Sequence, residues 1–153
     1  MRLMYATGMR CAEIVACQVQ HLRWASYPPT VDDLEWVEGW ELGIVGKGNK
    51  PRVVPVPDIV IGDLTGYLAS RGLPADLRAP ESKGAHLLGH AVDVAQQAPW
   101  SPAAQANVDR LAGIGSQTWY DSMKGFFRIC ADQLSAHDPE AAAQLARAGA
   151  HFL

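Results

Sequence analysis

Residues 4–14 read MYATGMRCAEI, and this stretch decides where an opening helix ends and the next one starts. Gly8 is a natural helix stop, because glycine adopts backbone conformations with positive φ at little steric cost. Thr7 is expected to cap the helix that follows, and Arg10 stands in its first turn. Glu13 is expected on the polar side of this second helix, at a spacing that would also suit a simple surface ion pair with Arg10.

The rest of the chain predicts strands and helices that together make an α+β domain. Two strand-like runs flank a turn rich in glycine, which is typical of a β-hairpin, and Pro55 and Pro57 are expected to end the second strand. Later segments carry apolar residues at helical spacing. Ile59 is expected on the apolar face of the helix at 58–70, and Trp119, Met123 and Phe126 on that of the helix at 116–134. Pro139 suits the first turn of the last helix. The expected elements are strands at 40–45 and 52–56, helices at 10–19, 58–70, 116–134 and from 138 onward, and loops at 25–34 and 74–101.

The composition is that of a folded globular protein, with 48% hydrophobic and 19% charged residues. A length of 153 residues fits one domain of ordinary size. No apolar run approaches the roughly 18 residues that a membrane-spanning helix needs, and Arg10 interrupts the N-terminal apolar stretch too early for a secretory signal. We therefore expect a single cytoplasmic domain, spanning residues 1–153, with no membrane partner.

Cysteine usage and charge limit the choice of ligands. The three cysteines include no C-x-x-C pair, so neither a metal site nor a disulfide framework is indicated. The net charge of −3 argues mildly against DNA binding. However, Lys47, Lys50 and Arg52 form a compact basic group, and a local basic patch can bind phosphate even in a slightly acidic protein.

The stretch around Arg10 resembles the first conserved box of the tyrosine recombinases, or phage integrases, which reads T-G-x-R-x-x-E. In that family the arginine binds the scissile phosphate, so the resemblance implies a catalytic role for Arg10. The chemistry is suitable, because a guanidinium is always charged and can hold two phosphate oxygens at once. An arginine at the start of a helix also aims backbone N–H groups toward an anion.

A second resemblance lies in residues 45–56, which read VGKGNKPRVVPV and are similar to the β-hairpin of the family. Lys47 matches the lysine that protonates the departing 5′ oxygen of DNA, which implies that it is a catalytic acid. Lys50 and Arg52 are interpreted as contacts to the DNA backbone, with ordinary surface charges as an equal alternative. A nucleotide-binding P-loop is not indicated, because the pattern G-x-x-x-x-G-K-[ST] is absent.

The last residues of the sequence resemble the approach to the second box of the family, H-x-L-R-H, with its first histidine at His151. In the family this histidine assists proton transfer around the phosphate. A second arginine and the nucleophilic tyrosine follow it in the family, whereas all four tyrosines of this sequence precede His151. We therefore expect an incomplete catalytic domain that is inactive by itself.

The resemblance implies a mostly helical DNA breaking-rejoining domain with a small antiparallel hairpin, incomplete at its C-terminus. It further implies site-specific recombination through a 3′-phosphotyrosyl intermediate, with duplex DNA and further recombinase subunits as partners, and with neither a metal nor a small-molecule cofactor. Two alternatives stay open, namely a non-catalytic DNA-binding or interaction module on the same fold and an unrelated domain with fortuitous matches. The segment between Arg10 and Lys47 is longer than usual for the family, with the additional residues at 28–38.

Overall fold

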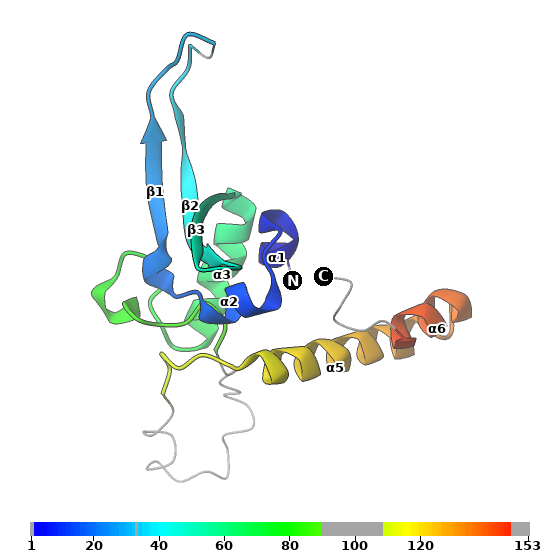
Figure 1. The fold of residues 1–153 in the computed structure, drawn as a ribbon. Coiled ribbons are helices and arrows are strands. Elements are labelled where there is room, and N and C mark those ends of the chain that lie inside the picture. Colours follow the sequence, from blue (N-terminus) through cyan, green and yellow to red (C-terminus); the bar gives the residue numbers. More distant parts are fainter. Residues whose placement is uncertain (1, 33, 90–108, 148–153) are drawn as a thin grey trace. The chain divides into compact units, whose positions relative to one another are not determined.

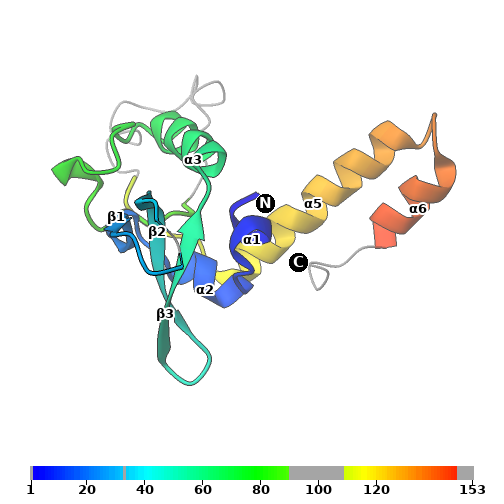
Figure 2. The same ribbon diagram turned by 90° about the horizontal axis from the view of Figure 1, so that it is seen from above.

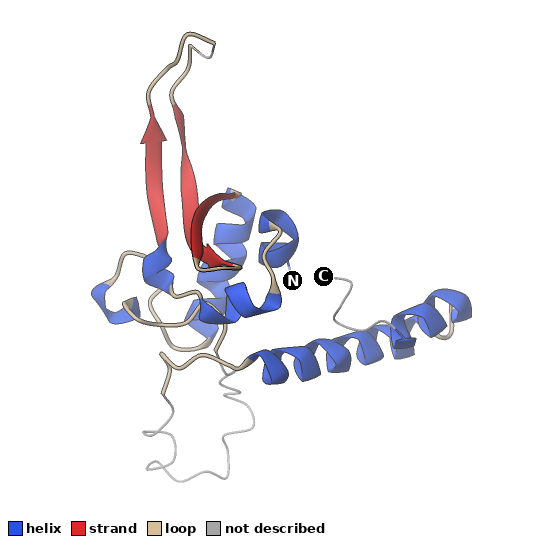
Figure 3. Ribbon diagram, viewed as in Figure 1, coloured by secondary structure: helices blue, strands red, loops and turns tan. Residues whose placement is uncertain are grey.

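The computed structural model describes residues 2–32, 34–89 and 109–147 (Figure 1). The chain divides into two compact units, Met1–Gly113 and Ile114–Leu153. The first unit combines helices with an antiparallel sheet, and the described part of the second consists of helices (Figure 3). The protein therefore has the α+β architecture that the sequence predicted. Among the described residues, no helix combines the length and apolar character needed to cross a membrane.

A three-stranded antiparallel sheet in the order β1-β2-β3 organises the first unit. Strand β1 (Leu22–Tyr27) pairs with β2 (Val37–Gly46), which also pairs with β3 (Lys50–Val56) and is thus the central strand. The hairpin predicted between β2 and β3 is confirmed. Its turn takes positive φ values at Gly48 (75°) and Asn49 (59°), two residue types that tolerate this conformation.

Helices α1 (Arg2–Thr7), α2 (Cys11–Ala16) and α3 (Asp58–Ser70) contact the sheet, as does the short 3-10 turn η1 (Val19–His21). A second 3-10 turn, η2 (Pro80–Ser82), follows α3. Helix α3 has the bounds that its apolar pattern predicted. Burial of apolar side chains from the sheet and the helices is the main stabilising term. The core includes Met4, Met9, Ile14, Val19, Leu22, Leu42, Ile44, Val56, Val60, Leu64, Leu68 and Leu87.

Arg71, which follows α3, ties later segments of the first unit to this helix. Its side chain is almost fully buried and donates hydrogen bonds to the carbonyl oxygens of His86 (2.7 Å), Arg110 (2.6 Å) and Ala112 (3.3 Å). The guanidinium also lies over the ring of Tyr67, 5.6 Å from its centroid. Burial of this charge is tolerated because backbone carbonyls replace the water that it loses.

The β1–β2 hairpin projects from the first unit as a long arm (Figure 1). Strand β2 pairs with both neighbours at Trp40, but from Val37 to Gly39 it pairs with β1 alone. We call residues 25–39 the β1–β2 arm. Figure 2 looks along this arm and shows the β2–β3 turn leading away from α3.

The second unit contains α5 (Ser116–Leu134) and α6 (Pro139–Arg147), which pack against each other. Both helices begin as the sequence predicted, and α5 also ends at the predicted residue. The Asp138 carboxylate accepts a hydrogen bond from the Ala141 backbone N–H at 2.9 Å, which caps α6. The apolar face of α5 buries Trp119 and Met123, but Phe126, expected on the same face, is 48% exposed.

The junction between α1 and α2 differs from the sequence prediction in two respects. Thr7 does not cap α2, because its hydroxyl donates to the carbonyl oxygen of Leu3 at 2.6 Å in the preceding turn. Arg10 takes the N-cap position instead, with extended backbone angles (φ −79°, ψ 157°). Helix α2 also ends at Ala16, earlier than predicted, and a 3-10 turn follows it. Gly8 does stop α1, with φ of 60°.

Three further predictions are wrong at the level of single residues. Residues 25–27 belong to β1 rather than to a loop, because cross-strand pairing with β2 extends through Tyr27. Pro55 lies within β3, which is tolerated because β3 is an edge strand. Ile59 was expected to face the core but is 67% exposed, and Val60 is buried in its place. Only part of the predicted 74–101 loop lies within the described residues, and it contains η2.

Candidate phosphate-binding site

Arg10 is presented at the start of α2 with most of its side chain in solvent. The positive φ of Gly8 turns the chain out of α1 before Arg10 begins the next helix. The Arg10 side chain is 64% exposed. Its guanidinium therefore keeps donor groups available for a ligand that approaches from solvent.

Glu13 is the buried centre of this region, with only 5% of its side chain exposed. Its carboxylate accepts hydrogen bonds from the Arg10 backbone N–H (2.8 Å) and from Arg10 Nη1 (3.3 Å). A third bond comes from Nη2 of Arg52, which reaches Glu13 from β3 at 3.0 Å. The prediction that Glu13 faces solvent is wrong, and these three donors explain how a carboxylate can be buried.

The β2–β3 hairpin approaches the same carboxylate through Gly46. A Cβ added to Gly46 would lie 3.2 Å from Glu13 Oε1, so the absence of a side chain lets the strand come close. Lys47 follows Gly46 directly, in the turn, and is exposed. Glu13 therefore links the helix that carries Arg10 to the hairpin that carries Lys47.

The two other predicted DNA contacts differ in their surroundings. Lys50 opens β3 and is exposed. Arg52 has 40% of its side chain exposed, and it makes the ion pair with Glu13. Arg52 thus has a structural contact in addition to whatever it does toward a ligand. His151, the third predicted catalytic residue, lies outside the described residues.

A cavity of about 620 Å³ borders the site on the Glu13 side. Its walls come from α2, η1 and all three strands, and they include Glu13, Cys17, His21, Arg23, Ile44 and Arg52. Burial raises the pKa of the Cys17 thiol from 9.0 to about 11, and the negative charge of Glu13 adds to this effect. Cys17 is therefore a neutral thiol at ordinary pH and a poor nucleophile.

In the described part of the chain, His, Cys, Asp and Glu side chains form no group of three or more that could hold a metal ion. The charged groups that do gather are two guanidiniums on one carboxylate, with the Lys47 ammonium on the adjoining turn. The two guanidiniums outweigh the single carboxylate, so this group carries a net positive charge, and the Lys47 ammonium adds to it. Such an arrangement is suited to an anion with several oxygens, such as a phosphodiester.

Several staphylococcal proteins named tyrosine recombinase XerD are similar to this chain. The Staphylococcus epidermidis protein is 31% identical over 114 residues, which cover 72% of this chain and 34% of that protein. The Staphylococcus aureus protein is 31% identical over 108 residues (71% and 32%), and the Staphylococcus saprophyticus protein is 30% identical over 105 residues (69% and 31%). The chain belongs to the tyrosine recombinase family. It spans about a third of the length of these relatives. No family model and no solved structure matches it.

Two features of this recombinase site were not predicted from the sequence. The contact between Arg52 and Glu13 joins residues 39 positions apart, and no local pattern indicates it. The role of Gly46 as a close-approach position was likewise not recognised, although a glycine before a β-turn is a common signal for one. The ion pair between Arg10 and Glu13, in contrast, follows from their spacing along a helix.

Proposed function

We propose that this chain provides the phosphate-binding part of the DNA breaking-rejoining catalytic domain of a site-specific recombinase. The observation that carries the proposal is the shared contact of Arg10 and Arg52 with the buried Glu13. This contact holds the two segments that resemble the catalytic boxes of the family against each other. Family membership supports the same conclusion.

In this proposal Arg10 binds the scissile phosphate through the exposed edge of its guanidinium. Glu13 fixes the orientation of Arg10 from the protein side, so that less side-chain entropy is lost on binding. The guanidinium also stabilises the negative charge that accumulates on the phosphate oxygens in the transition state. Lys50 adds a contact to a neighbouring phosphate, and Arg52 contributes mainly by holding Glu13.

Lys47 is proposed as the general acid of strand cleavage. A tyrosine hydroxyl attacks phosphorus and forms the phosphotyrosyl bond, while the bond from phosphorus to the 5′ oxygen breaks. Lys47 donates a proton to that departing oxygen, and His151 assists proton transfer around the phosphate. Rejoining follows the same steps in reverse.

The tyrosines of this sequence are poor candidates for the nucleophile. None of them follows His151, which is where the family places it. The Tyr67 hydroxyl donates to the carbonyl oxygen of Gly89 at 2.9 Å and accepts from the Gly89 N–H at 3.1 Å. The Tyr27 hydroxyl, in the β1–β2 arm, donates to the Glu41 carboxylate at its base. We therefore expect the 153-residue chain to bind DNA without becoming covalently attached to it.

The binding part of the proposal is tested by fluorescence anisotropy of a labelled DNA duplex over a range of salt concentrations. Arg10→Ala and Lys47→Ala should each weaken binding several-fold. Each should also make the negative slope of the logarithm of the association constant against the logarithm of the salt concentration less steep, by about 1. Lys83→Ala, which removes an exposed lysine elsewhere in the first unit, is the matched control and should leave both quantities unchanged. Equal behaviour of all three variants would refute the assignment of Arg10 and Lys47.

The covalent part is tested with a nicked suicide substrate, in which strand cleavage traps the protein–DNA link. Denaturing gel electrophoresis should show no slowly migrating adduct with the 153-residue chain. An adduct that disappears in Tyr5→Phe or Tyr120→Phe would contradict the proposal and would identify the nucleophile.

A further inference from the structure

The tip of the β1–β2 arm exposes a group of large apolar side chains. Val31, Leu34 and Trp36 are 96%, 83% and 63% exposed. Tyr27 and Val37, which form the last cross-strand pair before the tip, are 51% and 53% exposed. Isolated exposed apolar residues are common, but a group of five on one projecting element is typical of a surface that binds a partner.

The same part of the arm is strongly acidic. Residues 28–38 contain four acidic side chains and no lysine or arginine, so this segment has a net charge of −4 (0 − 4). The four residues are Asp32, Asp33, Glu35 and Glu38. A segment with this charge is repelled by the phosphates of nucleic acid and by anionic lipid headgroups. It is attracted to basic groups on a partner, and the exposed apolar side chains at the same place favour a partner surface that also has an apolar region.

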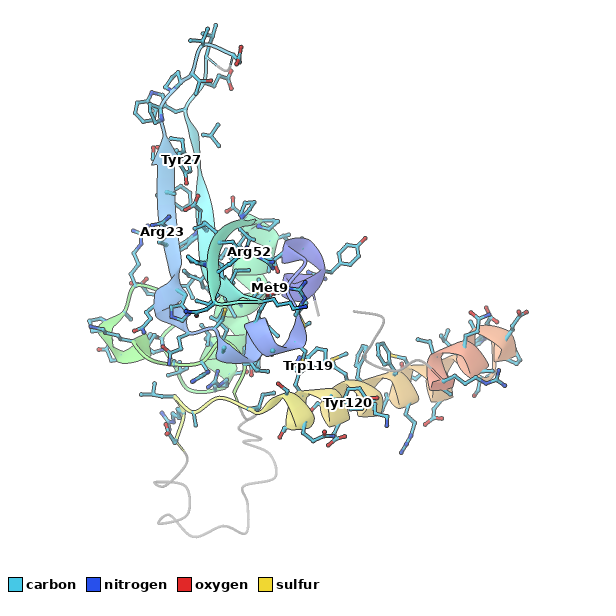
Figure 4. The ribbon with its side chains drawn as sticks, viewed as in Figure 1. Met9, Arg23, Tyr27, Arg52, Trp119 and Tyr120 are labelled. Carbon is cyan, nitrogen blue, oxygen red and sulfur yellow. The ribbon has the colours of Figure 1, made fainter. Side chains whose placement is uncertain are left out.

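Contacts at the base of the arm hold its two strands together. On one face, Arg23 Nε lies 3.1 Å from Glu41 Oε2, and the Tyr27 hydroxyl donates to the same carboxylate. Arg23 and Tyr27 lie one above the other along the arm (Figure 4). On the other face, Trp24 and Trp40 pack edge to face, with ring centroids 5.8 Å apart. The ribbon is therefore preorganised, which lowers the entropy lost when its tip is bound.

We propose that the β1–β2 arm is a docking element for a protein partner whose surface carries an apolar pocket bordered by lysine and arginine. The aromatic and aliphatic side chains of the tip fill the pocket, and the carboxylates of Asp32, Glu35 and Glu38 meet the basic border. The charge of the arm selects this partner over DNA, which we place at Arg10 and Lys47. The inference goes beyond the proposed function and does not depend on it.

The test uses labelled helical peptides as probes, one with leucine and lysine faces, one with serine and lysine faces and one with leucine and glutamate faces. The leucine–lysine peptide should bind at least about tenfold more tightly than either of the others, because only it satisfies both the apolar and the charge requirement. Leu34→Ser combined with Trp36→Ser should remove most of this preference. Ile59→Ser, which changes an equally exposed apolar residue on α3, is the control and should retain it.

A second variant distinguishes loss of the binding surface from misfolding of the protein. Tyr27 and Val37 are direct cross-strand partners, so replacing residues 28–36 by Asn-Gly gives a short hairpin with an intact register. This variant should keep the thermal unfolding midpoint and the DNA affinity of the unaltered protein but lose peptide binding. Equal binding of the leucine–lysine and serine–lysine peptides would overturn the proposal. Loss of DNA affinity, or sedimentation showing self-association that depends on the arm, would overturn it too.

Discussion

Glu13 is the residue on which the site depends, because its carboxylate is buried while Arg10 lies largely in solvent and Arg52 is partly exposed. Each arginine alone would be an ordinary surface charge. Their shared contact converts them into parts of one structure that extends from α2 to β3. This arrangement could not be read from the sequence, since the spacing of Arg10 and Glu13 predicts an ion pair on a helix surface but says nothing about Arg52.

Replacement of Glu13 by glutamine should destabilise the protein by about 1–2 kcal/mol, because the side chain keeps its shape but loses charge-assisted hydrogen bonds to two partly exposed guanidiniums. Urea unfolding measured by tryptophan fluorescence gives this value. Glu81→Gln, at an exposed glutamate in η2, should change the free energy of unfolding by less than about 0.5 kcal/mol. Equal effects of the two substitutions would show that the Glu13 contacts contribute no stability.

The pKa of the Cys17 thiol depends in part on the charge of Glu13. The folded protein holds the thiol proton with a pKa of about 11 instead of 9.0, so stability should fall as pH rises from about 9 towards 11. Burial is the larger cause and the Glu13 charge the smaller, so Glu13→Gln should lower the pKa of Cys17 without restoring its ordinary value. The measurement is the pH midpoint of iodoacetamide alkylation in a background of Cys11→Ser and Cys130→Ser. An unchanged midpoint would show that Glu13 does not act on the thiol.

At the scale of elements, the close approach of the β2–β3 hairpin to α2 depends on Gly46. Gly46→Ala should weaken DNA binding and cost about 1 kcal/mol, because the new methyl group would press on one oxygen, Oε1, of the Glu13 carboxylate, and this carboxylate is held in place by three donors. Gly39→Ala is the matched control in the same strand, since a Cβ there meets no atom within 4 Å. Anisotropy with a DNA duplex and urea unfolding measure the two effects. If both alanine variants behave alike, the hairpin does not depend on this approach.

The packing of Arg71 makes a similar prediction for the loops that follow α3. A Cβ at Gly89 would lie 2.0 Å from Arg71 Nη2 and 2.7 Å from the Ala112 carbonyl oxygen, so Gly89→Ala should be strongly destabilising, by more than about 3 kcal/mol. Gly66→Ala, in the open face of α3, should instead stabilise by up to about 1 kcal/mol. Thermal unfolding compares the two variants directly. A Gly89→Ala protein as stable as the unaltered one would disprove the packing around Arg71.

The elements that were predictable from the sequence are those with a strong local pattern. Helices α3 and α5 have apolar residues at helical spacing with clear stops, and the β2–β3 hairpin has glycine and asparagine in its turn. Strand β1 was not predicted, because Pro28 and Pro29 indicated a loop from residue 25 onward, whereas cross-strand pairing with β2 extends through Tyr27. The burial of Val60 rather than Ile59 depends on the direction in which α3 packs, which its own sequence leaves open.

At the scale of the whole molecule, the central claim is that helix α2 and the β2–β3 hairpin form one phosphate-binding site through Glu13. The family resemblance indicated Arg10 and Lys47 as functional residues, and the structure adds the carboxylate that connects their elements. His151 keeps its place in the proposal on the strength of the sequence alone. The β1–β2 arm adds an acidic and apolar element that is separate in chemistry from this basic site.

The most direct test of this claim is a double-mutant cycle for duplex DNA binding between Glu13→Gln and Arg10→Ala. We predict that Glu13→Gln weakens binding although it removes a negative charge, and that Arg10→Ala has a several-fold smaller effect in the Glu13→Gln background than alone. If Glu13 were only a nearby negative charge, its removal would strengthen binding and the two substitutions would be additive. That result would contradict the account.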